Sequence, residues 1–135
     1  MSKTDTTKKT RTRLSPKARK NMILDCAAKL VGEEGVSAVT MERLGTEAEI
    51  SKALVYNYFP SVKLLLQTLL TREYRHLRRV QLEAAESSET LEQMVRRVTK
   101  VYLSYISDRG LIIERLSLEP SVANSGDPNK YGRDP

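Results

Sequence analysis

Apolar residues recur at helical spacing over most of this 135-residue chain. In the first such stretch, Ser15-Pro16 precedes the pattern and Gly35 follows it. Serine caps helix N-termini, proline suits the first helical position, and glycine commonly ends helices. The spacing therefore predicts a helix from Pro16 to Glu34 that buries one face. The residues of this face are Ile23, Cys26, Ala27, Leu30 and Val31.

Two short helices joined by a tight turn are predicted next. Thr40 caps a helix over residues 41–48, and Ser51 caps a helix over residues 52–58. Pro60 ends the second of these, because proline disfavours helical geometry in the residue before it. Successive helices of which the last two are short and adjacent are typical of a helix-turn-helix.

Three further helices are predicted from the apolar spacing, so the chain is expected to be all-α. They cover residues 62–86, a segment from Glu89 to near Asp108, and residues 111–118. The step Asp108-Arg109-Gly110 is expected to separate the last two. From residue 120 onward the chain has proline and glycine but almost no apolar residues, which predicts a loop-like tail.

Composition excludes several classes of protein. The chain is 39% hydrophobic and 30% charged but only 5% aromatic, which favours a helical core over a β-sandwich. No apolar run is long enough for a membrane span or a signal peptide, so a cytoplasmic protein without membrane contact is expected. With one cysteine and one histidine, neither a disulfide scaffold nor a zinc finger fits, and no metal or cofactor is expected. A glycine-rich phosphate loop and a nucleophile elbow are both missing, so the chain is not expected to be an enzyme.

Positive charge is concentrated at the N-terminus. Residues 1–20 hold eight lysines and arginines against one aspartate, while the whole chain has a net charge of +6. A basic arm ahead of a folded domain attracts polyanions through counterion release. On charge alone, a solubilising leader is an equal alternative.

The predicted helix over residues 52–58 has the chemistry of a DNA-reading element. Ile50, Val55 and Phe59 are spaced to anchor it to the preceding helices. Lysine reaches guanine or phosphate, a small residue permits close approach, and tyrosine hydroxyls bond phosphate. The alternative is that Leu54 belongs to the core and that the tyrosines lie at its rim. The outward residues are Lys52, Ala53, Leu54, Tyr56, Asn57 and Tyr58.

The motif Ser51-Lys52-x-x-x-Tyr56-x-Tyr58-Phe59-Pro60-Ser61 resembles the DNA-binding head of the TetR family of bacterial transcriptional regulators. The resemblance covers about residues 17–66, and the ending Tyr-x-Tyr-Phe-Pro-Ser is specific to it. It implies that Thr40 bonds phosphate, that Lys52, Ala53 and Leu54 face base edges, and that the other three outward residues hold the DNA backbone and neighbouring bases.

Three positions depart from the family pattern. In the family, a lysine at the start of the fourth helix binds phosphate. That position is Val62 here, and Lys63 follows one place later. Glu49 stands where the turn usually has glycine, so either it adopts a left-handed conformation or the turn is built differently. Gly45 replaces a usual alanine, which slightly weakens its helix.

The resemblance also implies a sensor: a homodimeric, ligand-responsive repressor whose two heads bind a palindromic double-stranded DNA operator and respond to a small-molecule effector. Residues 1–14 are then a flexible basic arm, 15–61 the helix-turn-helix domain, 62–119 the start of an apparently truncated helical ligand-binding and dimerisation domain, and 120–135 the tail. Arg11 and Arg13 of the arm are expected in the minor groove. Apolar residues that are either core or a ligand pocket are Leu66, Leu70, Tyr74, Met94, Val98, Tyr102 and Leu116.

A second function is compatible with the arm. A helical interaction module could use the polybasic segment to contact RNA or anionic membrane. That hypothesis leaves the residues between Lys52 and Tyr58 unexplained. The sequence therefore favours the DNA-binding regulator.

Overall fold

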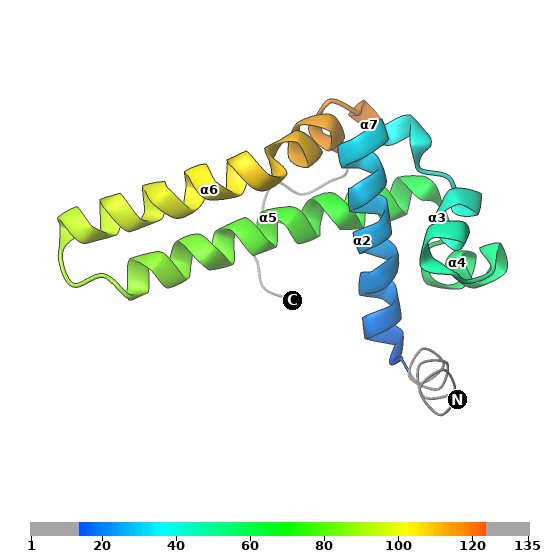
Figure 1. Cartoon of the computed structure of the whole chain (residues 1–135), viewed down its shortest axis with the longest axis horizontal. Helices are drawn as coiled ribbons and strands as arrows, with labels where there is room; N and C mark the ends of the chain where they lie inside the picture. Colours follow the sequence, from blue (N-terminus) through cyan, green and yellow to red (C-terminus); the bar gives the residue numbers. More distant parts are fainter. Residues whose placement is uncertain (1–13, 124–135) are drawn as a thin grey trace, which may run out of the picture.

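A computed structural model describes residues 14–123, which contain helices and no strands. Two long helices form an antiparallel pair, α2 crosses them near one end, and α3 and α4 lie beside α2 (Figure 1). The all-α prediction is confirmed for this part of the chain. The helices are α2 (Pro16–Glu34), the 3₁₀ turn η1 (Val36–Ala38), α3 (Met41–Ala48), α4 (Lys52–Tyr58), α5 (Val62–Glu86), α6 (Leu91–Ser117) and α7 (Pro120–Ala123).

Side-chain caps fix where the helices begin. The hydroxyl of Ser15 accepts a hydrogen bond from the backbone N–H of Ala18 at the start of α2, at 3.1 Å. Ser61 caps α5 and Thr90 caps α6 in the same way. Each cap satisfies one of the backbone donors that a helix leaves unpaired in its first turn. The start of α2 predicted from Ser15-Pro16 is therefore confirmed.

One hydrophobic core joins the head, residues 15–61, to the helices that follow. Ile23 and Val31 of α2 are fully buried with Leu44 of α3 and Val55 of α4. The same cluster continues into α5, α6 and α7, so it crosses the predicted boundary between residues 61 and 62. The orientation of α2 and of the short helices packed on it is thus set by the long helices.

The predicted break at Asp108-Arg109-Gly110 is wrong, because α6 runs through it without interruption to Ser117. Glycine inside a helix costs only about 1 kcal/mol relative to alanine. Burial of Ile112 and Leu116 on the far side of the glycine outweighs that cost. Local sequence signals were overridden here by tertiary packing.

The predicted loop after residue 119 is wrong for its first four residues, which form α7. Proline is well tolerated in a first helical turn, as Pro120 is here. Val122 is buried in the common core, and the side-chain amide of Gln67 donates to the backbone carbonyl of Ser121 at 3.0 Å. These contacts hold the turn against α5.

Within the described residues, no helix combines the length and the apolar character required to cross a lipid bilayer.

Candidate nucleic-acid interface

Helix α4 is held to the head by the residues on its inner side. Val55 is fully buried and Phe59 is 1% exposed, while Ile50 is half-buried against the same core. The ammonium group of Lys20 lies over the ring of Phe59, 5.3 Å from its centroid, which adds a cation–π contact from α2. The predicted anchoring of this helix is therefore confirmed.

The outer side of α4 carries polar and small side chains. Lys52, Ala53 and Asn57 are exposed, and Tyr56 is 46% exposed. A lysine, a small residue, an amide and a phenol therefore share the exposed part of a short helix. This combination suits a DNA groove, because it offers hydrogen-bond donors and permits close approach.

Two residues predicted to face outward lie partly inside. Leu54 is half-buried, and the half-buried Tyr58 packs against the core. The position of Tyr58 agrees with the alternative in which the tyrosines lie at the rim of the core, whereas Leu54 is not part of the core cluster. Their predicted DNA contacts stay predictions.

Helix N-termini supply further candidate phosphate contacts. Thr40 is exposed, and its hydroxyl oxygen accepts from the backbone N–H of Arg43 at 3.0 Å, so its own hydroxyl proton remains available to a phosphate. Lys63 is exposed at the second position of α5, whereas Val62 is half-buried against the core. At the start of α5, the exposed positive charge is therefore that of Lys63 and not at position 62.

In the turn between α3 and α4, Glu49 adopts the left-handed conformation, which is the first of the two alternatives considered for this position. Glu49 has φ 57° and ψ 42°. The backbone N–H of Ile50 bonds the carbonyl of Gly45 at 2.9 Å, and that of Glu49 bonds the carbonyl of Thr46 at 3.3 Å. These two bonds form a Schellman motif, which usually has glycine where Glu49 stands.

Gly45 lets this turn approach α3 closely. A β-carbon at this position would lie 2.9 Å from the carbonyl oxygen of Ile50. The glycine therefore has a packing role, besides the small loss of helix propensity predicted from the sequence.

Arg43 is directed at α2 and was not predicted as a structural residue. Its guanidinium donates to both carboxylate oxygens of Glu34, at 3.2 and 2.8 Å, and lies 3.6 Å from Glu47. The hydrogen bonds and charge of Arg43 lower the pKa of Glu34, and those of Glu34 raise the pKa of Arg43. The bidentate pair joins the end of α2 to the first turn of α3.

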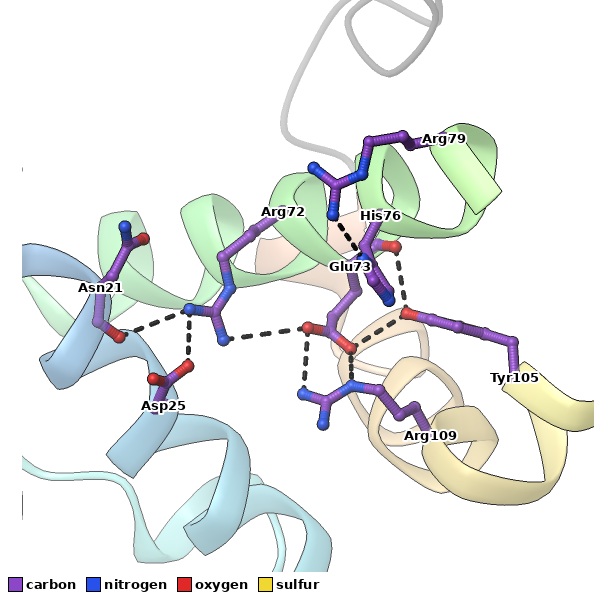
Figure 2. Close-up of polar contacts among 8 residues, drawn as sticks. All are labelled: Asn21, Asp25, Arg72, Glu73, His76, Arg79, Tyr105 and Arg109. Atoms are coloured by element: carbon purple, nitrogen blue, oxygen red, sulfur yellow. Dashed lines mark hydrogen bonds and ion pairs between the residues drawn. The ribbon is translucent and has the colours of Figure 1, made fainter. Parts of the chain in front are cut away.

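A buried polar cluster, which the sequence did not predict, lies where α2, α5 and α6 meet (Figure 2). Glu73 is 3% exposed, accepts from two guanidinium nitrogens of Arg109, and accepts from the Tyr105 hydroxyl at 3.0 Å. Arg72 pairs with Asp25 of α2 at 2.8 Å and lies 3.9 Å from Glu73. Charges from three helices are thus linked in one cluster.

The residues predicted as core or ligand pocket fall into two groups. Leu66, Leu70 and Leu116 are buried in the common core, and the half-buried Tyr74 packs against it. Met94 and Val98 are half-buried on α6, and Tyr102 is 43% exposed. A ligand pocket formed by these seven residues stays a prediction. Arg11 and Arg13 lie outside the described residues.

Similarity to known proteins is strongest in the head. Residues 23–68 match the family described as bacterial regulatory proteins, tetR family. The chain is similar to the HTH-type transcriptional repressor KstR of Rhodococcus jostii, with 34% identity over 61 residues that cover 45% of this chain and 29% of that protein. It is also similar to the HTH-type transcriptional regulator BetI of Rhizobium meliloti, with 29% identity over 83 residues that cover 62% of this chain and 41% of that protein.

Solved structures extend the similarity of fold beyond the head. A TetR family transcription regulator from Marinobacter aquaeolei superimposes with a TM-score of 0.70 at 16% identity, covering 84% of this chain and 59% of that one. The chain thus spans about three fifths of that structure and less than half of the curated relatives. Residues 23–68 thus match the tetR family of bacterial regulatory proteins, and the all-α fold of the chain is similar to that of solved TetR family regulators.

Proposed function

We propose that this chain is a sequence-specific DNA-binding transcriptional regulator that inserts α4 into a major groove. The observation that carries the proposal is the two-sided character of α4. Val55 is buried behind the helix, while Lys52, Tyr56 and Asn57 are exposed in front of it. A helix fixed from behind presents its polar side chains in a set geometry, which sequence readout requires.

The outward residues divide into base-reading and backbone-holding roles. Lys52 and Ala53 at the start of α4 face base edges, and the N-terminal residues of a recognition helix typically do this. Tyr56 and Thr40 donate hydroxyl protons to phosphates, and Lys63 adds a charge at the start of α5. Leu54, Asn57 and Tyr58 complete the surface, and Arg11 and Arg13 reach the minor groove.

The regulator acts as a homodimer on a palindromic operator, since a two-fold pair of heads matches two half-sites. Leu91, Val95 and Leu103 lie in one i, i+4 row of α6 and are all more than half exposed. Exposed apolar area of this kind favours association with a second copy of the chain.

The oligomeric state tests this part of the proposal. Sedimentation equilibrium of the 135-residue chain should give a dimer, and Val95→Glu with Leu103→Glu should give a monomer with an unchanged helical circular dichroism spectrum. Lys29→Glu, an exposed change on α2, is the charge control and should remain dimeric. A wild-type monomer at all concentrations would refute the assignment of this surface.

Ligand response requires that α6 influence the head. The guanidinium of Arg115 donates to the carbonyl oxygens of Val31 and Gly32 in α2, and the Ile112 side chain packs at Gly32. An effector that shifts α6 would therefore move α2 and change the fit of α4 to DNA. Similarity to a relative named as a repressor supports repression as the output.

Salt dependence separates DNA recognition from general attraction to anions. Binding to a palindromic duplex recovered from a random library should weaken steeply with salt, yet remain stronger than binding to scrambled duplex at every salt concentration. Vesicles of anionic lipid and single-stranded RNA serve as comparison probes. Equal affinity for the palindrome and the scrambled duplex, or preference for vesicles or RNA, would overturn the proposed function.

A further inference from the structure

A cationic cavity lies beside the buried polar cluster, between α2 on one side and α5 and α6 on the other. Its volume is about 710 Å³, within the range of small-molecule sites. Five cations line it against two carboxylates, Asp25 and Glu73, which leaves a net charge of +3 with histidine neutral. The cations are Lys17, Arg72, Arg75, Arg79 and Arg109.

Two of the five cations are already neutralised by the protein. Arg72 pairs with Asp25, and Arg109 donates to the buried carboxylate of Glu73 (Figure 2). These pairs use the negative charge that lines the cavity. The excess positive charge therefore belongs to the remaining three side chains.

Lys17, Arg75 and Arg79 have no carboxylate within ion-pair distance in residues 14–123. The Nε atom of Arg75 is buried and has no hydrogen-bond acceptor among these residues. A buried guanidinium donor left without an acceptor is costly. The positive charge of Lys17, Arg75 and Arg79 is therefore not matched by a carboxylate among the described residues that line the cavity.

Arg79 is positioned by a neighbouring ring. Its guanidinium donates to Nδ1 of His76 at 2.9 Å, and the His76 ring lies 5.7 Å from that of Tyr105 (Figure 2). This contact uses one of the five donors of the guanidinium and leaves others for a ligand. Arg75 and Arg79 are one helical turn apart on α5 and so offer adjacent forks for an oxyanion.

We propose that this cavity binds a small ligand carrying two negative charges on phosphate or carboxylate groups, held by Arg75, Arg79 and Lys17. Guanidinium groups bind both kinds of oxyanion in bidentate fashion, and the ammonium of Lys17 adds a contact from α2. The ligand bridges α2 to α5, so it stabilises the present orientation of the head. Anion binding does not rest on the proposed DNA-binding function and can be tested without DNA.

His76 provides a reporter inside the cavity, because it is the one histidine of the 135-residue sequence. The probes are inorganic phosphate and succinate, each titrated at fixed pH and at ionic strength held constant with sodium chloride. We expect saturable shifts of the His76 ring resonances with at least one probe, and matching heats in calorimetry. The two probes distinguish a phosphate ligand from a dicarboxylate.

Arginine variants identify the residues responsible. Arg75→Gln with Arg79→Gln should weaken binding of the effective probe at least about tenfold, because charge-assisted hydrogen bonds are lost. Arg75→Lys keeps the positive charge but not the forked guanidinium, so its affinity for the probe should lie between those of wild type and the double variant. Arg78→Gln, an exposed change on the same helix outside the cavity lining, should bind as wild type. Thermal melts establish that each variant is folded.

Three outcomes would overturn the proposal. The first is a non-saturating drift of the His76 resonances that chloride reproduces. The second is unchanged probe binding in the Arg75 and Arg79 double variant. The third is loss of duplex DNA affinity in that variant without any phosphate or succinate binding by wild type, which would assign these arginines to DNA.

Discussion

The guanidinium of Arg115 donates to the backbone carbonyl oxygen of Val31 at 2.7 Å, and to that of Gly32 at 3.1 Å. Arg115 is in the last turn of α6, and the two carbonyls are in the last turns of α2. A cation near helix C-terminal carbonyls is favourable because it meets the negative end of the helix dipole. The Arg115 side chain thus links the C-terminal end of α6 to α2, the first helix of the head.

Loss of these hydrogen bonds between α6 and α2 should destabilise the head. We expect Arg115→Gln to lower the free energy of unfolding by about 1–2 kcal/mol, because hydrogen bonds to a charged donor are lost. Urea unfolding followed by circular dichroism measures the change. Arg96→Gln removes an exposed arginine that pairs with Glu92 on the same helix, and should cost less than about 0.5 kcal/mol. Equal costs for the two variants would contradict a special role for Arg115.

The pair formed by the buried Glu73 and the partly exposed Arg109 predicts a non-additive response to mutation. Arg109→Leu leaves a buried carboxylate without its main partner and should cost about 3 kcal/mol. The double variant Glu73→Leu with Arg109→Leu should recover most of that loss, since two apolar residues of similar volume need no partners. Chemical denaturation of the single and double variants gives the coupling free energy. Additive losses would show that the pair does not act as a unit.

The raised pKa of Tyr105 should make the stability of the protein depend on pH in the alkaline range. Burial, followed by the charge and hydrogen bond of Glu73, raises the pKa of this phenol well above its ordinary value of about 10. The unfolded chain therefore loses the proton first, so stability falls as pH rises above about 10. Absorbance at 295 nm should show one tyrosine that ionises only as the protein unfolds. Tyr105→Phe should remove that step, and its persistence would contradict the assignment.

Glu49 is the one described residue other than glycine with positive φ. Glu49→Gly should raise stability by about 1 kcal/mol, because glycine adopts the left-handed conformation without the penalty that a β-carbon brings. For a domain of this size the melting temperature should rise by several degrees. Glu49→Ala removes the carboxylate but keeps the β-carbon, so it should give no such gain. If alanine stabilised the protein as much as glycine, charge rather than backbone conformation would be responsible.

The head could be predicted from sequence because its signals are local. Ser51 and Thr40 cap their helices through their own side chains, and Val55 and Phe59 follow helical spacing. The resemblance around Tyr56 then indicated a family, and the model of that family matches residues 23–68.

The buried cluster could not be predicted in this way. The partner of Glu73 is Arg109, 36 positions away, and no local pattern distinguishes a buried carboxylate from an exposed one. The continuity of α6 was missed for a related reason. Gly110 carries a local signal for a break, whereas the burial of Ile112 and Leu116 against other helices decides the outcome.

The base preference of α4 shows whether this helix reads DNA sequence. Wild type, Lys52→Ala and Tyr56→Phe would be compared on a selected operator and all of its single-base variants, at one fixed salt concentration. Tyr56→Phe should weaken binding to every duplex by a similar factor, because it loses a phosphate contact. Lys52→Ala should instead lose about 1–3 kcal/mol at particular base pairs and so change the ranking of the variants. If Lys52→Ala kept the wild-type ranking across the whole panel, the assignment of this face to base readout would be contradicted.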